Sequence, residues 1–319
     1  MSVEKQDGTG GFVAELRAFG NQLPHKGLFL VLFVAWLALF QFLGNSVLGY
    51  FHTPSLFSWL SGVYKSSPDD SFGQFIPLVV LALLWWKREQ LQSVPKSHWW
   101  PALALFVLTL LLHMLGYALQ QTRISLVAFF LGLYALTGLL WGWRWLRTTL
   151  FPYFLFTFMM PLNTFAEVIT FPLRLLAAKI TVFVSEFILG MGVRGDGTRI
   201  IDLVDGHQFD VAAECSGIRS LSTILALASV VAFMSFQRPW KRTLVIAAAF
   251  PVAVISNVFR LLTIIVAKKN FGTSAALSVH ESFLFSIWPY VPAVVCLFLL
   301  VRWLSDDLAP TPGQKVDAP

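Results

Sequence analysis

Charge and cysteine are both scarce in this chain of 319 residues. Asp, Glu, Lys and Arg make up 13% of it, about half the share found in an ordinary soluble domain. Hydrophobic residues make up 56%, and the mean hydropathy is +0.70. This composition excludes a soluble domain, a disordered chain and a nucleic-acid-binding module. It predicts an integral membrane protein that crosses the bilayer several times.

The two cysteines, Cys215 and Cys296, are too few for a disulfide framework, and the sequence has no Cys/His spacing typical of a metal site. We therefore predict no metal and no cofactor. The net charge of +6 is typical of a membrane protein whose cytoplasmic loops are rich in Lys and Arg. It does not predict a nucleic-acid partner.

Long apolar runs predict an all-α integral membrane protein with about eight transmembrane helices. The eight runs are residues 28–50, 75–86, 102–119, 124–146, 150–162, 215–236, 243–267 and 283–303. The second and fifth are short for a bilayer that needs about 20 helical residues, so we extend both toward their N-terminal ends.

Basic residues indicate how these helices face. With the N-terminus inside, the short cytoplasmic loops hold more Lys and Arg than the short outer loops, so we predict that both termini are cytoplasmic. The inner loops hold Lys87, Arg88, Lys96, Arg144, Arg147, Arg238, Lys241 and Arg242, and the outer loops hold Lys65, Arg123, Lys268 and Lys269. The predicted organisation is a cytoplasmic segment (1–27), a membrane domain (28–305) and a disordered cytoplasmic tail (306–319).

One long segment, residues 163–214, lies outside in this arrangement. Residues 164–190 are hydrophobic but carry charges, which favours an amphipathic helix that lies at the outer interface or packs in the bundle; a ninth span is the alternative. Gly195, Gly197 and the Asp205-Gly206 pair are turn signals. Residues 200–204 and 208–211 flank the Asp205-Gly206 pair, which predicts a small β-hairpin just before Cys215.

Polar residues inside membrane spans are costly, and they indicate function by default. Such residues lie in or beside the last three runs: Cys215 and Arg219, Asn257 and Arg260, and His280 and Glu281. At about 1.5 Å of rise per residue, Cys215 and His280 lie about 33 Å above the cytoplasmic edge and Arg260 about 26 Å. We therefore expect these three side chains to reach the outer leaflet at similar heights.

Cysteine, arginine and histidine together fit nucleophilic catalysis. A thiolate attacks a peptide carbonyl, histidine moves the proton, and a guanidinium stabilises the oxyanion. Taken alone, Cys215 and His280 also have purely structural interpretations, as Cys296 does. Arg219 either binds substrate or pairs with a nearby carboxylate, and Asn257, one turn before Arg260, orients that side chain.

The segments AAECSGIRSL and SNVFRLL, followed by a histidine ahead of the last span, resemble the exosortase/archaeosortase family of multi-pass membrane transpeptidases. The D-G-x-x-F-x-V hairpin before the cysteine is similar as well. The motif-bearing part covers about residues 200–300. Here the histidine lies in V-H-E-S-F, whereas many members have an Asp-His pair, so Glu281 is a candidate partner of His280.

The resemblance implies that Cys215 is the nucleophile, Arg260 the oxyanion or substrate stabiliser and His280 the acid/base. Asn257, Arg219 and Glu281 would support them. The implied substrates are exported proteins with a C-terminal sorting signal: a short motif such as Pro-Glu-Pro, a transmembrane helix and a basic cluster. They would be cleaved through a thioester at the outer (periplasmic) face of the inner membrane and passed to an unknown acceptor nucleophile, in connection with extracellular polysaccharide and biofilm.

Membrane lipids are the other expected partner. The outer basic residues either hold an acidic sorting motif or are solvated charges: Arg194, Arg199, Lys268 and Lys269. The alternative function is a polytopic transporter or a scaffold of a polysaccharide export system. A transporter is expected to place polar residues near the midplane and to show repeated halves, and the sequence shows neither.

Overall fold

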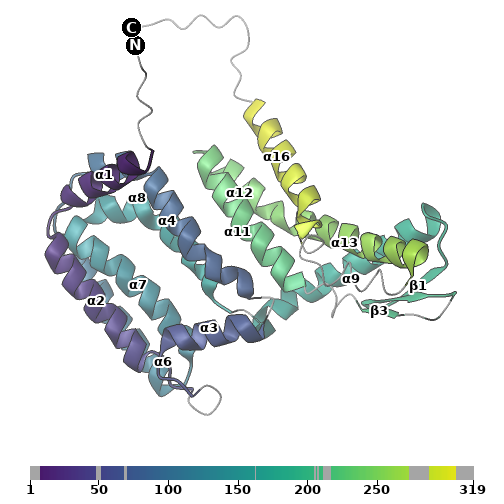
Figure 1. Ribbon diagram of the computed structural model, residues 1–319, viewed down its shortest axis with the longest axis horizontal. Coiled ribbons are helices and arrows are strands. Elements are labelled where there is room, and N and C mark those ends of the chain that lie inside the picture. Colours follow the sequence, from purple (N-terminus) through teal and green to yellow (C-terminus); the bar gives the residue numbers. More distant parts are fainter. Residues whose placement is uncertain are drawn as a thin grey trace, which may run out of the picture. The chain divides into compact units, whose positions relative to one another are not determined.

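The computed structural model describes residues 8–47, 52–67, 70–161, 163–204, 206, 208–210, 217–272 and 287–306. The chain divides into two compact units, residues 1–161 and 162–319. In Figure 1 the first unit runs from purple to teal and the second from teal to yellow. Both units are built mainly of helices, as predicted for an all-α membrane protein.

The first unit is helical throughout its described part. Its elements are α1 (Gly8–Asn21), α2 (Lys26–Leu43), α3 (Leu56–Ser66), η1 (Ser71–Phe75), α4 (Ile76–Trp86), α5 (Arg88–Ser93), α6 (Pro101–Ala118), α7 (Thr122–Trp141), α8 (Trp143–Phe154) and η2 (Leu155–Met159). Helix α7 is the most deeply buried of these, and it packs against α2, α3, α6 and α8. The Trp36 indole of α2 donates a hydrogen bond to the Phe129 carbonyl of α7 (3.0 Å) and lies directly over Gly132, where a Cβ would come within 2.1 Å of the ring.

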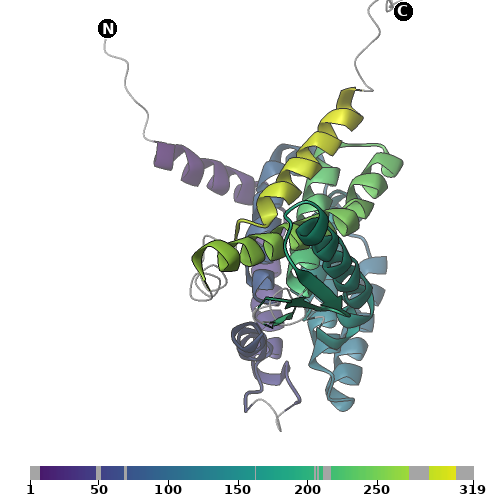
Figure 2. The same ribbon diagram turned by 90° about the vertical axis from the view of Figure 1, so that its right-hand side faces the viewer.

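The second unit combines helices with a small sheet. Its described elements are α9 (Asn163–Phe187), β1 (Val193–Asp196), β2 (Arg199–Asp202), β3 (Gln208–Asp210), α11 (Gly217–Ser235), α12 (Pro239–Ala247), α13 (Ala249–Phe271) and α16 (Tyr290–Asp306). Helix α13 is the centre of this unit, because it packs against α9, α11, α12 and α16. Figure 1 shows β1 and β3 near one end of α9 and α13, and Figure 2 shows α16, in yellow, starting beside α13.

The core of the second unit uses small side chains where the helices meet. Ala228, Ala249 and Ala293, from α11, α13 and α16, are fully buried in one cluster. Ala177 and Ala178 of α9 are buried against α13 in two further clusters. Small residues let helix backbones approach closely, which is how helices associate within a membrane.

The sheet has the order β1-β2-β3, with both neighbouring pairs antiparallel. Its inner face carries Val193 and Ile200, which are buried against Ala178 of α9 and Leu261 of α13. Because Val193 pairs with Asp202, the Asp202 side chain lies on that same face.

The pairing of β2 with β3 confirms the predicted hairpin. Strand β2 ends at Asp202, two residues earlier than expected, because the Asp202 carboxylate accepts a hydrogen bond from the Val204 amide (3.0 Å) and turns the chain there. Strand β1 was not predicted, since Gly195 suggested a turn. In the structure Gly195 lies in β1 against α9, where a Cβ would approach Val182 to 3.3 Å.

Within the residues that the structure describes, five helices are long and apolar enough to cross a membrane: residues 26–43, 101–118, 122–141, 167–187 and 239–271. Three shorter apolar helices cover residues 71–86, 220–235 and 290–305. Seven of the eight predicted runs therefore coincide with an apolar helix in the described part of the chain. The multi-pass character is confirmed, and the count of eight crossings stays a prediction.

Two segments differ from expectation. The predicted run 150–162 is not among those apolar helices; α8 ends at Phe154, after the internal Pro152, and continues as the short 3-10 helix η2. Residues 164–190, predicted to lie at the outer interface or to pack in the bundle, form most of α9, which packs against α13 and α11 and meets the length and hydropathy of a crossing helix over residues 167–187. The alternative of an additional span in this region therefore gains support.

Candidate functional site

The predicted site residues are divided between described and undescribed parts of the chain. Cys215, His280 and Glu281 lie outside the described residues. Arg219 belongs to the first turn of α11, but its side chain lies outside the description. Asn257 and Arg260 lie on α13 and are described in full. The structure therefore establishes the surroundings of the α13 residues and the paths of the neighbouring helices.

Asn257 joins α13 to the beginning of α11. Its side chain is 4% exposed, and its Oδ1 accepts a hydrogen bond from the Ser220 Oγ at 3.0 Å. Ser220 lies in the first turn of α11, five residues after Cys215 in the sequence. A hydrogen bond between two buried side chains fixes both the rotation and the height of one helix against the other.

The preceding residue joins the same turn of α13 to the chain before α16. The buried Ser256 hydroxyl donates a hydrogen bond to the Pro289 carbonyl. One turn further along, the Phe259 ring packs on the Trp288 ring, with centroids 5.6 Å apart. These contacts hold residues 288 and 289 against α13. The two residues come shortly after residues 273–286, the stretch that contains His280.

Two chain segments, the beginning of α11 and the chain before α16, thus converge on one stretch of α13, residues 256–260. Arg260 lies one turn after Asn257, on the same side of the helix. It is partly buried, and within the described part of the chain its guanidinium makes no hydrogen bond or ion pair. A guanidinium held at this depth without such a partner is available to a bound anion or oxyanion.

Ser220 and Ser256 were not singled out by the sequence analysis, although they supply the contacts that assemble this region. Serine is common in membrane helices, where its hydroxyl can return to its own backbone, as Ser229 does with the Leu225 carbonyl (2.8 Å). The only available signal was their position, next to Arg219 and Asn257 respectively.

Helix α9 carries a second buried polar feature. Thr170, Arg174, Thr181 and Ser185 are all buried and follow one another at helical spacing on one side of the helix. The Arg174 guanidinium lies 3.5 Å from the Glu167 carboxylate, and its Nε has no hydrogen-bond partner. A buried cation is destabilising unless it is paired, so the pair with Glu167 makes Arg174 tolerable inside the bundle.

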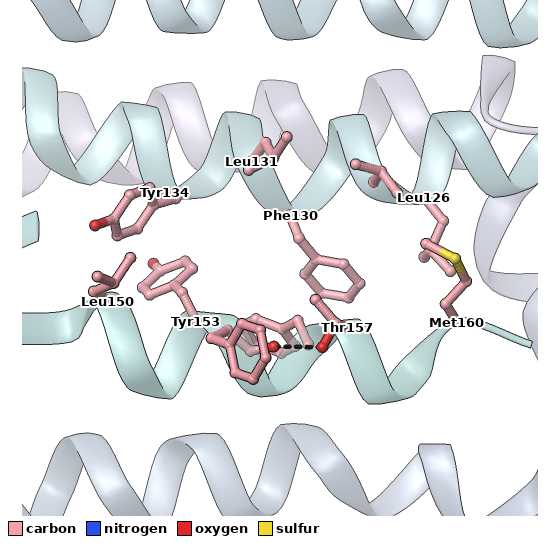
Figure 3. A pocket seen from close by; sticks show the side chains of 11 residues that line it. Leu126, Phe130, Leu131, Tyr134, Leu150, Tyr153, Thr157 and Met160 are labelled. Carbon is pink, nitrogen blue, oxygen red and sulfur yellow. Dashed lines mark hydrogen bonds between the residues drawn. The ribbon is translucent and has the colours of Figure 1, made fainter. Parts of the chain in front are cut away.

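An apolar cavity in the first unit is lined by none of the predicted site residues. It has a volume of about 230 Å³, and Figure 3 shows side chains of α7, such as Phe130 and Tyr134, facing Tyr153 and Thr157 across it. Its lining holds no carboxylate, thiol or imidazole. Its side-chain oxygen atoms are the hydroxyls of Tyr134, Tyr153 and Thr157.

Among the described residues no group of three or more His, Cys, Asp or Glu side chains lies close enough together to hold a metal ion. The described site residues are instead an amide, two hydroxyls and a guanidinium. They are suited to hydrogen bonding and to stabilising negative charge.

One of the three comparisons with known proteins gave a match. A family model described as transmembrane exosortase matches residues 59–302, which is most of the chain and includes all the convergent segments. No match was found among curated proteins, and none among solved structures.

Proposed function

The chain belongs to the transmembrane exosortase family, and from this premise we propose that it is a membrane cysteine protease/transpeptidase with Cys215 as its nucleophile. The observation that carries the proposal is the hydrogen bond between Ser220 and Asn257. It fixes the beginning of α11, which directly follows the cysteine segment, one helical turn from Arg260.

Covalent geometry limits how far Cys215 can lie from Ser220. Cys215 precedes Gly217, the first residue of α11, by two positions, and two extended residues span at most about 7 Å. Ser220 lies about 4.5 Å further along the helix. The Cα atom of Cys215 is therefore at most about 12 Å from that of Ser220, within reach of a substrate held at Arg260.

The chemistry follows from the residue types. The Cys215 thiolate attacks the scissile carbonyl carbon, and the Arg260 guanidinium stabilises the resulting oxyanion. His280 donates a proton to the departing amine as the C–N bond breaks, leaving a thioester. An acceptor nucleophile then attacks the thioester carbonyl, gives its proton to His280 and releases the thiolate. Asn257 holds α11 in place, and Arg219 and Glu281 would support substrate and His280.

The proposed substrates are exported proteins with a C-terminal sorting signal, consisting of a short motif, a transmembrane helix and a basic cluster. The proposed location is the inner membrane, with both termini cytoplasmic and the site at the outer face. A link to extracellular polysaccharide and biofilm proteins belongs to the same proposal. It rests on the family and on the basic residues that favour this orientation.

Helix α9 fits this orientation if it replaces residues 150–162 as the fifth crossing. The number of crossings then stays at eight, so the sheet and the beginning of α11 remain outside. A crossing of about 20 residues from Thr164 ends near Phe183, so Lys179 lies one turn, about 6 Å, from the outer interface, where its ammonium can reach water. Arg174, deeper in the span, is buried beside Glu167.

Cysteine labelling distinguishes the two arrangements. In a background carrying Cys215→Ser and Cys296→Ala, we expect Thr198→Cys, in the turn between β1 and β2, to react with an impermeant maleimide in intact cells. Asn163→Cys, at the beginning of α9, should be protected until the membrane is opened. Labelling of Asn163→Cys in intact cells would instead place residues 150–162 across the membrane and α9 at the outer interface.

The experiment that tests the function is co-expression with a tagged protein from the same genome that ends in a sorting signal of this kind. We expect loss of the signal with the wild-type enzyme and no loss with Cys215→Ala. Cys296→Ala is the matched control, because Cys296 is a partly buried cysteine packed against the apolar core of α11, α13 and α16. Equal cleavage by wild type and Cys215→Ala would exclude Cys215 as the nucleophile.

A further inference from the structure

Large apolar side chains are exposed at one end of the second unit, where α9 ends and the turn after β2 begins. Phe187 and Ile188 at the end of α9 are 75% and 69% exposed, and Leu203 and Val204 in the turn are 62% and 88% exposed. The Leu203 amide donates a hydrogen bond to the Gly192 carbonyl (2.8 Å), so the turn lies beside the short segment that leaves α9. We refer to these four apolar residues as the apolar tip. Exposed apolar surface of this kind marks a contact with a protein or with a membrane.

The apolar tip continues the exposed side of α9. Exposed apolar residues recur along that helix at spacings of three, four and seven residues, which places them on one side of it. They are Ile169, Leu176, Ile180, Phe183 and Phe187. The other side of the helix carries Ala177 and Ala178, which are buried against α13. The exposed side of a membrane helix faces lipid, and Phe187, whose ring packs on that of Phe183 (centroids 4.9 Å apart), belongs to both surfaces.

The backbone of the tip suits an apolar environment, because its amides are hydrogen-bonded within the protein. The Val204 amide donates to the Asp202 carboxylate (3.0 Å), and the Ile188 amide donates to the Val184 carbonyl (3.0 Å). An amide that enters the bilayer without a partner is costly, which excludes most turns from it. The Leu203, Val204 and Ile188 amides can leave water without losing a hydrogen bond.

Charged residues beside the tip match the surface layer of a bilayer. Lys269, in the last turn of α13, has an exposed side chain and lines the same cavity as Val204. An ammonium next to exposed apolar side chains can pair with lipid phosphates while those side chains reach the acyl chains. Asp205 follows Val204 in the sequence, and a carboxylate is costly in the hydrocarbon core. This limits the tip to the boundary between headgroups and acyl chains.

We propose that the apolar tip inserts into the outer leaflet of the membrane at this boundary, so that its partner is the lipid surface. The choice of leaflet follows the proposed orientation, whereas the insertion goes beyond the proposed function and does not depend on cleavage. The sheet then has two attachments. Val193 and Ile200 pack against α9 and α13, and the turn after β2 lies in the lipid. Together they set the height of the sheet at the membrane surface.

Depth-dependent fluorescence quenching tests the insertion in the full-length protein. In the Cys215→Ser/Cys296→Ala background, the dye nitrobenzoxadiazole is attached to Val204→Cys, and the protein is reconstituted in phosphatidylcholine vesicles. A lipid with a nitroxide near the top of its acyl chain should remove about half of the emission, and one with a nitroxide near the end of the chain should remove less, because the tip lies at the headgroup boundary. Thr198→Cys is the matched control. It lies in the turn at the opposite end of β2 and should keep its emission.

Two further probes make each outcome decisive. Leu203→Cys reports on the same turn if Val204→Cys fails to fold, and Ile188→Cys reports on the end of α9; both should be quenched as Val204→Cys is. Equal quenching at Val204→Cys and Thr198→Cys would overturn the insertion, and so would quenching at Ile188→Cys alone, because α9 would then meet the lipid without the sheet. A blue-shifted emission at Val204→Cys that neither lipid quenches would also overturn it, since a protein surface would then cover the tip. The Cys215→Ser background cleaves nothing by the proposed mechanism, so failure of the proposed function leaves this result unchanged.

Discussion

The hydrogen bond between Ser220 and Asn257 allows a quantitative test of how the site is assembled. Ser220→Ala leaves the Asn257 Oδ1 buried without a donor, which costs about 1–3 kcal/mol of stability. Asn257→Leu leaves the serine hydroxyl free to rotate toward a carbonyl of its own helix, and we expect a smaller cost of about 0.5–1.5 kcal/mol.

The double variant separates the bond from the other effects of each change. Replacing both partners with apolar groups removes the unpaired acceptor, so Ser220→Ala/Asn257→Leu should be more stable than the two single losses predict together. The expected coupling is about 1 kcal/mol, compared with an average of about 0.6 kcal/mol for hydrogen bonds between membrane helices. Thermal unfolding of the purified protein in detergent measures it.

The functional readout is the rate at which the tagged protein with the C-terminal sorting signal is cleaved. We expect each single variant, and the double variant, to process the substrate at least about fivefold more slowly, because α11 is no longer fixed against α13; this corresponds to a loss of about 1 kcal/mol of transition-state stabilisation. The double variant should recover stability without recovering rate, since the bond that sets α11 against α13 is gone.

Ser229→Ala is the matched control, because Ser229 is also buried on α11, and in the described part of the chain its hydroxyl bonds to Leu225 of its own helix. It should retain the wild-type rate. If Ser220→Ala behaves as Ser229→Ala does in both assays, the hydrogen bond does not position the site and the argument for convergence on α13 fails.

Two further substitutions have definite expected outcomes. Arg260→Lys keeps the charge but loses the planar donor pair, so processing should fall by about 10²–10³-fold; a rate near wild type would show that a point charge is sufficient there. Gly132→Ala places a Cβ against the Trp36 ring and should lower the stability of the first unit by about 1–3 kcal/mol. Gly27→Ala, with nothing within 4 Å of its Cβ, should not destabilise the protein, and equal melting temperatures for the two glycine variants would contradict the packing.

Apolar periodicity predicted the helices well because burial in a bilayer requires long uninterrupted runs. At residues 150–162 and at α9 the structure differs from the preferred prediction for opposite reasons, and which of the two crosses the membrane stays a prediction. The first run is apolar but contains Pro152, and its helix ends early. The second carries Arg174, whose charge argued against a crossing, whereas the structure buries that side chain beside Glu167. Hydropathy counts charges and does not show which of them are paired.

The sheet shows which features follow from local sequence and which depend on contacts between residues far apart in the chain. The Asp205-Gly206 pair is a local turn signal, and it correctly predicted the antiparallel pairing of β2 with β3. Strand β1 depends on a close approach of Gly195 to Val182 in α9. A contact with a residue in another element cannot be read from the residues around Gly195. The glycine therefore suggested a turn instead of a strand.

For the site, the sequence identified Asn257 and Arg260 because polar residues inside an apolar run are visible without a structure. It did not identify Ser220 as the partner of Asn257, because a partner depends on how two helices are rotated and offset along their axes.

Residues 256–260 show why this matters: consecutive side chains of α13 contact α11 on one side and the chain before α16 on the other. The height estimates for the three spans required only that their polar groups reach similar depths. The contacts of Ser256 and Asn257 add the stronger constraint that the spans meet at a single helical turn, and one altered side chain in that turn is therefore expected to disturb two of the three segments.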